Sequence, residues 1–171
     1  MPRGIFVVFV ALIAILMTAC DTAISSSGSS SSGVCIGECG IVTHIVDGDT
    51  IDVEIDGVEY RVRYIGINTP ERDEVCYSEA TAANAALVEG QTVRLEMDTS
   101  ETDPFGRLLR YVYVGDVFVN RRLVADGYAE AALYPPDDEY YSDLRRFEVD
   151  AARNNRGCHP TGIFDDNDAE R

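Results

Sequence analysis

Lysine is absent from this 171-residue chain, and each of its 14 basic residues is an arginine. The 30 Asp and Glu residues leave a formal net charge of -16. A broad basic surface that holds phosphates is therefore excluded. A negatively charged partner must instead be bound by a few individual arginine side chains. The repulsion among the negative charges of this chain is tolerable in concentrated salt, because the Debye length is only about 3 Å at 1 M. The composition favours a protein from a high-salt habitat.

Apolar runs long enough to span a membrane are also missing. The run at residues 5–19 falls short of the ~20 residues that a spanning helix needs. It follows Arg3 and ends in small residues, which is typical of a secretory signal peptide at residues 1–19. The cleavage site resembles that of a lipoprotein, so we expect Cys20 to become the first mature residue and to carry a lipid. An ordinary cleaved signal and an uncleaved anchor are the alternatives.

A flexible tether is predicted to follow. Residues 25–33 contain only Ser and Gly, which cannot bury apolar surface. We therefore expect residues 20–38 to form a tether, residues 39–162 to form one folded domain outside the membrane, and residues 163–171 to form an acidic tail.

Four cysteines remain in the exported part, and in an oxidising compartment they favour disulfides over free thiols. Cys35, Cys39, Cys76 and Cys158 allow three pairings. We favour a local Cys35–Cys39 bridge and a long-range Cys76–Cys158 bridge, the latter contributing about 4 kcal/mol on a chain-entropy estimate. The alternative is a zinc site of Cys35 and Cys39 with one of the two histidines, but this arrangement lacks the usual ligand spacing. Those histidines are His44 and His159.

Period-two alternation of apolar residues predicts five strands. They fall at residues 41–45, 51–55, 58–67, 92–97 and 108–114. Asp47-Gly48 and Asp56-Gly57 lie between the first three as hairpin signals. We therefore expect antiparallel pairing among the first three strands.

Three helices are predicted between and after the strands. An alanine-rich helix covers residues 78–88, with Ser78 as its N-cap and Gly90 after its end. A short helix covers residues 119–125, and an amphipathic helix covers residues 140–154. One helix inserted after the third strand favours an α+β, mainly β, fold: a small closed five-stranded barrel with three helices.

Four segments carry a family resemblance. They are VDGDT (residues 46–50), RYIGINTPE (63–71), DPFGR (103–107) and VNRRLVADG (119–127). In this order and at this spacing, from about residue 43 to residue 157, the chain resembles the staphylococcal nuclease family. That resemblance implies an OB-fold, a five-stranded Greek-key barrel.

The resemblance also implies a Ca²⁺ site made of Asp49, Asn68 and the backbone carbonyl of Thr69. All three offer oxygen, which a hard cation prefers. Asn68 stands where the family usually has Asp. An amide oxygen can still ligate the ion, but the missing negative charge is expected to lower the calcium affinity.

Three catalytic roles follow from the same resemblance. Glu71 matches the general base that takes a proton from water, and Arg63 and Arg107 match the two phosphate-binding arginines. Each guanidinium group can present a two-pronged fork to phosphate oxygens, which an ammonium group cannot do. The alternative for Arg63 taken alone is an ion pair on the strand surface with Glu54 or Glu59.

Substrate contacts are implied at two aromatic residues. Phe105 and Tyr134 match positions where the family stacks a base, and a ring face accepts any base. The basic residue that the family has beside the first aromatic is Pro104 here. We therefore expect little sequence preference.

The sequence thus predicts a monomeric, calcium-dependent, sequence-non-specific nuclease, a phosphodiesterase that cleaves DNA and is a candidate for cleaving RNA. We expect it on the outer face of the cell membrane, held by its lipid, or secreted. Two alternatives remain: a catalytically weakened barrel that binds nucleic acid or protein, and a structural envelope lipoprotein.

Overall fold

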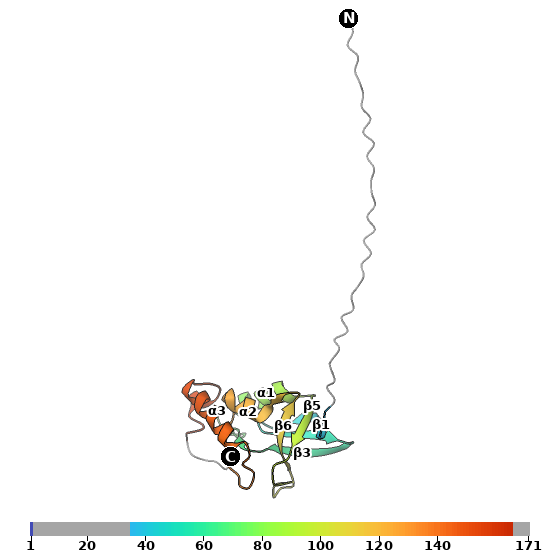
Figure 1. Cartoon of the computed structure of the whole chain (residues 1–171). Coiled ribbons are helices and arrows are strands. Elements are labelled where there is room, and N and C mark those ends of the chain that lie inside the picture. Colours follow the sequence, from blue (N-terminus) through green and yellow to red (C-terminus); the bar gives the residue numbers. More distant parts are fainter. Residues whose placement is uncertain (2–34, 166–171) are drawn as a thin grey trace. The chain divides into compact units, whose positions relative to one another are not determined.

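The computed structural model describes Met1 and residues 35–165 of the chain (Figure 1). The predicted signal peptide, the lipidation site Cys20 and most of the tether and acidic tail lie outside the described residues. The expectations about them therefore stay predictions. In the described part of the chain, no helix is both long enough and apolar enough to cross a membrane.

Five strands close into a barrel, as the alternating pattern predicts. They are β1 (Glu38–Ile45), β2 (Thr50–Ile55), β3 (Val58–Tyr64), β5 (Thr92–Glu96) and β6 (Leu108–Val114). Antiparallel pairing gives the order β3-β2-β1-β5-β6, and a parallel pairing of β3 with β6 closes the ring. Apolar side chains that alternate along these strands fill its interior, among them Ile51, Val53, Val62, Val93 and Val112.

The turn between β2 and β3 confirms one of the hairpin signals. Asp56 and Gly57 have φ values of 50° and 81°, as a two-residue type I′ turn requires. Ile55 and Val58 are consequently paired at the end of the ladder. This register sends Val62 into the core and leaves Arg61 and Arg63 on the opposite side of β3.

Three helices and a 3-10 turn accompany the barrel. They are α1 (Tyr77–Val88), α2 (Val119–Ala125), α3 (Tyr141–Arg153) and η1 (His159–Thr161). The predicted N-cap Ser78 is wrong, because helix α1 already begins at Tyr77. Its N-cap position is Cys76, which has a left-handed φ of 74° and makes no side-chain cap hydrogen bond. A disulfide holds Cys76 at this turn, which places Ser78 inside the first turn of the helix.

The predicted third strand is not continuous. It breaks after Tyr64 at Gly66, which has a positive φ of 76°, and resumes as β4 (Ile67–Asn68). Strand β4 leaves the barrel and pairs with β8 (Glu130–Ala131), while β7 (Val117–Phe118) extends the β6 edge. These two-residue strands are too short to show a period in the sequence. The break places Asn68 close to Arg63.

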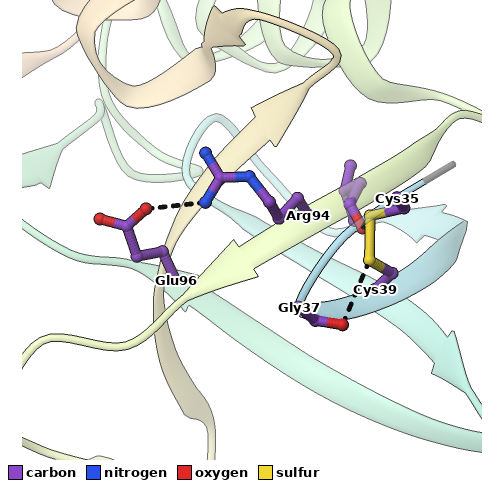
Figure 2. Close-up of a disulfide and its surroundings, with 6 residues drawn as sticks. Cys35, Gly37, Cys39, Arg94 and Glu96 are labelled. Carbon is purple, nitrogen blue, oxygen red and sulfur yellow. Dashed lines mark hydrogen bonds and ion pairs between the residues drawn. A yellow bond between two sulfur atoms is a disulfide. The ribbon is translucent and has the colours of Figure 1, made fainter. Parts of the chain in front are cut away.

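Both favoured disulfides are present, with Cα–Cα distances of 6.3 Å for Cys35–Cys39 and 5.8 Å for Cys76–Cys158. Figure 2 shows the first beside β5, where Arg94 and Glu96 form an ion pair at 2.7 Å. Because the thiols are consumed in these bonds, the alternative of a zinc site with Cys35 and Cys39 is excluded.

Candidate active site

One cavity of about 600 Å³ collects most of the predicted site residues. Six predicted side chains line it: Asp49, Arg63, Glu71, Phe105, Arg107 and Tyr134. They come from five separate segments: the β1–β2 loop, strand β3, the loop before α1, the loop between β5 and β6, and the loop after β8. We call this the main cavity. The fold therefore brings together residues that are up to 85 positions apart in the sequence.

Arg63 is the more enclosed of the two arginines that line the cavity, with a side chain only 10% exposed. Its Nη1 donates hydrogen bonds to the carbonyl oxygens of Tyr64 and Ile67, at 2.7 and 2.8 Å. Its Nη2 donates to Oδ1 of Asn68 at 2.6 Å, and its Nε lies 3.2 Å from Oδ1 of Asp49. A single guanidinium group thus joins two of the predicted metal ligands.

These contacts exclude the alternative for Arg63 and narrow its expected role. Its carboxylate partner is Asp49, rather than Glu54 or Glu59. Its Nη1 is also fully used by backbone carbonyls that the strand break turns inward, so one Nη2 N–H has no hydrogen bond within residues 35–165 and can bind an outside group. This is less than the two-pronged fork expected from the family resemblance.

Asp49 is held equally firmly. Its Oδ2 accepts hydrogen bonds from the backbone N–H and the hydroxyl of Thr69, both at 2.9 Å, and its Oδ1 accepts from the Thr50 hydroxyl at 3.1 Å. The close approach of Thr69 requires Gly48, since a Cβ at Gly48 would lie 2.7 Å from the Thr69 side chain. We call Asp49, Arg63, Asn68 and Thr69 the inner network.

Asp47 belongs to the site, although its sequence pattern indicates only a turn residue. It lines the main cavity, and its pKa is raised to about 6 by burial and, secondly, by the charge of Asp49. The backbone N–H of Asp49 donates to its Oδ1 at 3.1 Å, which opposes this rise. Its position two residues before Asp49 in the VDGDT segment is the signal that could have identified it. A cation near both carboxylates would relieve their repulsion.

The oxygen chemistry of this region fits calcium. Asp47 and Asp49 offer carboxylates, Asn68 an amide oxygen and Thr69 a backbone carbonyl, all ligands that Ca²⁺ accepts among its 6–8 oxygens. The described residues contain no group of three or more His, Cys, Asp or Glu side chains placed to hold a metal. The protein would therefore supply part of the coordination shell, and a cation at Asp49 and Asn68 would compete with the N–H donors of Arg63.

Arg107 lies on the loop between β5 and β6 and is more open than Arg63, with a side chain 31% exposed. Asp103 orders this loop, because its Oδ1 accepts the backbone N–H groups of Phe105 and Arg107, both at 2.9 Å. Its Oδ2 pairs with Nε of Arg107 at 2.5 Å. Burial opposes ionisation of Asp103, but these hydrogen bonds outweigh it and lower its pKa. We call Asp103, Phe105 and Arg107 the loop cluster.

The two predicted stacking residues differ in their contacts. The side chain of Phe105 projects into solvent and is 85% exposed. Tyr134 is 39% exposed, and its hydroxyl donates to Oδ1 of Asn68 at 2.9 Å. Phe105 therefore exposes most of its ring for stacking, with the Arg107 guanidinium group 5.6 Å from the ring centroid, whereas Tyr134 is tied to the inner network.

Asp137 is a second residue that sequence reasoning missed. It is buried, and its Oδ1 accepts the backbone N–H groups of Thr99 and Ser100 at 2.9 and 2.7 Å. These hydrogen bonds connect the loop between β5 and β6, which carries the loop cluster, to the segment after β8 that carries Tyr134. Nothing in the local pattern distinguishes Asp137 from the neighbouring acidic residues of this acidic chain.

Glu71 stands at the exposed rim of the main cavity. Its backbone N–H donates to Oε2 of Glu74 at 2.7 Å, and its carbonyl accepts the N–H of Glu74 at 2.8 Å, so the turn is fixed at both ends. Its carboxylate is one of five that line the cavity, against two guanidinium groups. The lining is therefore net negative although it contains both predicted phosphate-binding arginines.

Comparison with known proteins gives a consistent result. The sequence model of a family described as "Staphylococcal nuclease homologue" matches residues 61–158. A thermonuclease of Staphylococcus intermedius is 37% identical over 123 residues, which cover 68% of this chain and 73% of that protein. A thermonuclease of Staphylococcus hyicus is 34% identical over 118 residues, covering 66% and 70%. Endonuclease YncB of Bacillus subtilis strain 168 is 38% identical over 114 residues, covering 62% and 54%.

Proposed function

The chain belongs to the staphylococcal nuclease family, and on that premise we propose that it hydrolyses phosphodiester bonds of nucleic acids in the main cavity. The observation that carries the proposal is the convergence of Arg63, Glu71 and Arg107, from three separate segments, on one cavity. The relatives named thermonuclease and endonuclease support the same reaction class.

Each of these side chains has a distinct task in the reaction. The carboxylate of Glu71 takes a proton from a water molecule as the water oxygen attacks phosphorus. Arg107 and the remaining N–H of Arg63 donate hydrogen bonds to the phosphate oxygens and stabilise the negative charge that develops there. The bond to the leaving oxygen then breaks, and that oxygen takes up a proton from solvent.

We propose further that the reaction depends on calcium. Five carboxylates and two guanidinium groups line the cavity, so a phosphodiester entering it needs an additional positive charge. Bound Ca²⁺ would supply that charge and polarise a phosphate oxygen. Asp47, Asp49, Asn68 and the carbonyl of Thr69 would hold it. Since the ion would compete with Arg63 for Asp49 and Asn68, its binding would leave more N–H groups of Arg63 for the phosphate.

The proposed substrate is DNA in extended or frayed single strands, with RNA as a second substrate. The exposed ring of Phe105 can stack on any base, which supports cleavage with little sequence preference. The net charge of -16 gives no long-range attraction for nucleic acid, so capture would rest on the cavity itself.

We propose that the protein acts outside the cell, tethered through a lipid at Cys20. The two disulfides of the folded domain support an oxidising compartment, where such bonds persist. A mass measurement of the mature N-terminus tests the anchor. A free N-terminal residue other than a lipid-modified Cys20 would contradict it.

The test of the activity is digestion of supercoiled plasmid by the purified full chain in high salt. We expect relaxation and then fragmentation with Ca²⁺, and no change with a chelator. A parallel RNA substrate would define the substrate range. Absence of digestion with Ca²⁺, together with retained binding of single-stranded DNA, would instead support the binding-module alternative.

A further inference from the structure

A second cavity of about 410 Å³ adjoins the main cavity. Its lining comes from β2 and β3 on one side (Asp52, Glu59, Arg61) and from the neighbouring loop on the other (Phe105, Gly106, Arg107). Phe105 and Arg107 line both cavities. We propose that the second cavity is the binding subsite for the nucleotide next to the one at the cleaved bond, and that Arg61 contacts its phosphate. This inference rests on the proposed function.

The charges of the second cavity suit an anionic group at Arg61. Both carboxylates already have partners: Asp52 accepts from Nε and Nη2 of Arg61 at 2.8 and 3.1 Å, and Glu59 accepts from the Thr43 hydroxyl at 2.9 Å. The side chain of Arg61 is 52% exposed, and its Nη1 makes no hydrogen bond to any described residue. A phosphate can therefore approach the outer edge of this guanidinium group.

The spacing along β3 suits two consecutive phosphates. Arg61 and Arg63 are two residues apart on the same face of the strand, so their Cα atoms are about 6.6 Å apart. The axial rise in a stacked duplex is about 3.4 Å per nucleotide. Consecutive phosphates of one strand are farther apart than this axial rise, because the backbone winds around the axis, and an aromatic ring inserted between two bases extends the strand further. Two neighbouring phosphates can therefore span the spacing of the arginines.

Phe105 is placed to be that inserted ring. It lines both cavities and is 85% exposed, so a base in either cavity can contact its ring. The hydrogen bond from its backbone N–H to Asp103 fixes the loop beneath it. A strand passing over Phe105 would thus place one nucleotide in each cavity.

The decisive experiment measures binding without turnover. Full-length protein carrying Glu71→Gln is titrated in Ca²⁺ with two probes: octathymidylate, and the dinucleotide TpT, whose single phosphate cannot reach both arginines. On this background, Arg61→Gln is expected to weaken octathymidylate binding by about tenfold, or about 1.4 kcal/mol. It is expected to leave TpT binding unchanged. The slope of log affinity against log salt should become shallower by about 0.7.

Two further variants separate this role from a structural one. Asp52→Asn releases Arg61 from its carboxylate and is expected to tighten octathymidylate binding by about threefold. Arg94→Gln removes the same charge from an ion-paired strand arginine that lines neither cavity, and it should leave both affinities unchanged. Circular dichroism of each variant reports its folding, and Asp52→Asn still tests the subsite if Arg61→Gln does not fold.

The outcomes distinguish the subsite from the proposed function. The subsite is wrong if Arg61→Gln and Asp52→Asn shift the octathymidylate affinity in the same direction. It is also wrong if either variant alters TpT binding as much as it alters octathymidylate binding. An equal effect of Arg94→Gln would also overturn it, because the effect would then reflect overall charge. If protein with the native Glu71 does not cleave octathymidylate although Arg61→Gln selectively weakens its binding, the proposed hydrolysis fails while the subsite stands.

Discussion

The inner network and the loop cluster each place one arginine in the main cavity, but they hold it differently. Arg63 is 10% exposed and is bonded to two backbone carbonyls, an amide and a carboxylate. Arg107 is 31% exposed, and among the described residues its side chain contacts only its own loop: it pairs with Asp103 and lies 5.6 Å from the ring centroid of Phe105. The difference indicates that Arg63 stabilises the fold as well as lining the cavity, whereas Arg107 lines the cavity without bonds to the barrel strands.

The largest expected effect is that of Arg63→Ala. It leaves Asp49 and Asn68 without their cationic donor, and breaking a buried pair costs about 3–5 kcal/mol. Because a phosphate contact is lost as well, cleavage should fall by about 10³-fold. Urea unfolding and single-turnover cleavage check both effects. Unchanged stability would show that the inner network does not support the fold.

Arg107→Ala should separate the two effects. We expect cleavage to fall by about 10²- to 10³-fold. The free energy of unfolding should change by less than about 1 kcal/mol, because the Arg107 side chain is 31% exposed and Asp103 keeps its two backbone N–H donors in the variant. Equal destabilisation by Arg63→Ala and Arg107→Ala, in the same urea series, would remove the distinction between the two regions.

The sequence predicted the barrel of this site because a two-residue period and the Asp56-Gly57 turn are local signals. The convergence of Arg63, Glu71 and Arg107 followed from the family resemblance, since no local pattern places β3 beside the loop cluster. The enclosure of Arg63 could not be predicted. It depends on the break at Gly66, which turns the carbonyl of Ile67 toward the guanidinium group, and a strand of two residues leaves no period to recognise.

Asn68→Asp tests whether Asn68 of the inner network is a calcium ligand. Calcium affinity rises with the number of negative ligands, so this substitution should increase it by about tenfold. Isothermal titration with Ca²⁺, in the absence of nucleic acid, measures the change. If the affinity stays the same, Asn68 is not part of the calcium site.

The smallest expected effect concerns Asp103 in the loop cluster. Its pKa is lowered in the folded state, so its ionised form stabilises the protein above pH 3.8, and this contribution is lost as the pH falls through the folded-state pKa. Asp103→Asn should therefore cost about 0.5–1 kcal/mol at neutral pH and progressively less below pH 3.8. A stability difference that does not vary with pH would contradict this assignment.

Cleavage of octathymidylate by the Glu71→Gln variant, in Ca²⁺ and under single-turnover conditions, tests the proposed reaction most directly. Asp73→Asn is the matched control, since it removes an equal charge from the same exposed turn. We predict that Glu71→Gln lowers the rate by at least about 10²-fold, the range of general-base contributions, while Asp73→Asn cleaves like the unmodified protein. Glu71→Gln protein that cleaves at the unmodified rate would contradict the assignment of Glu71 as the base.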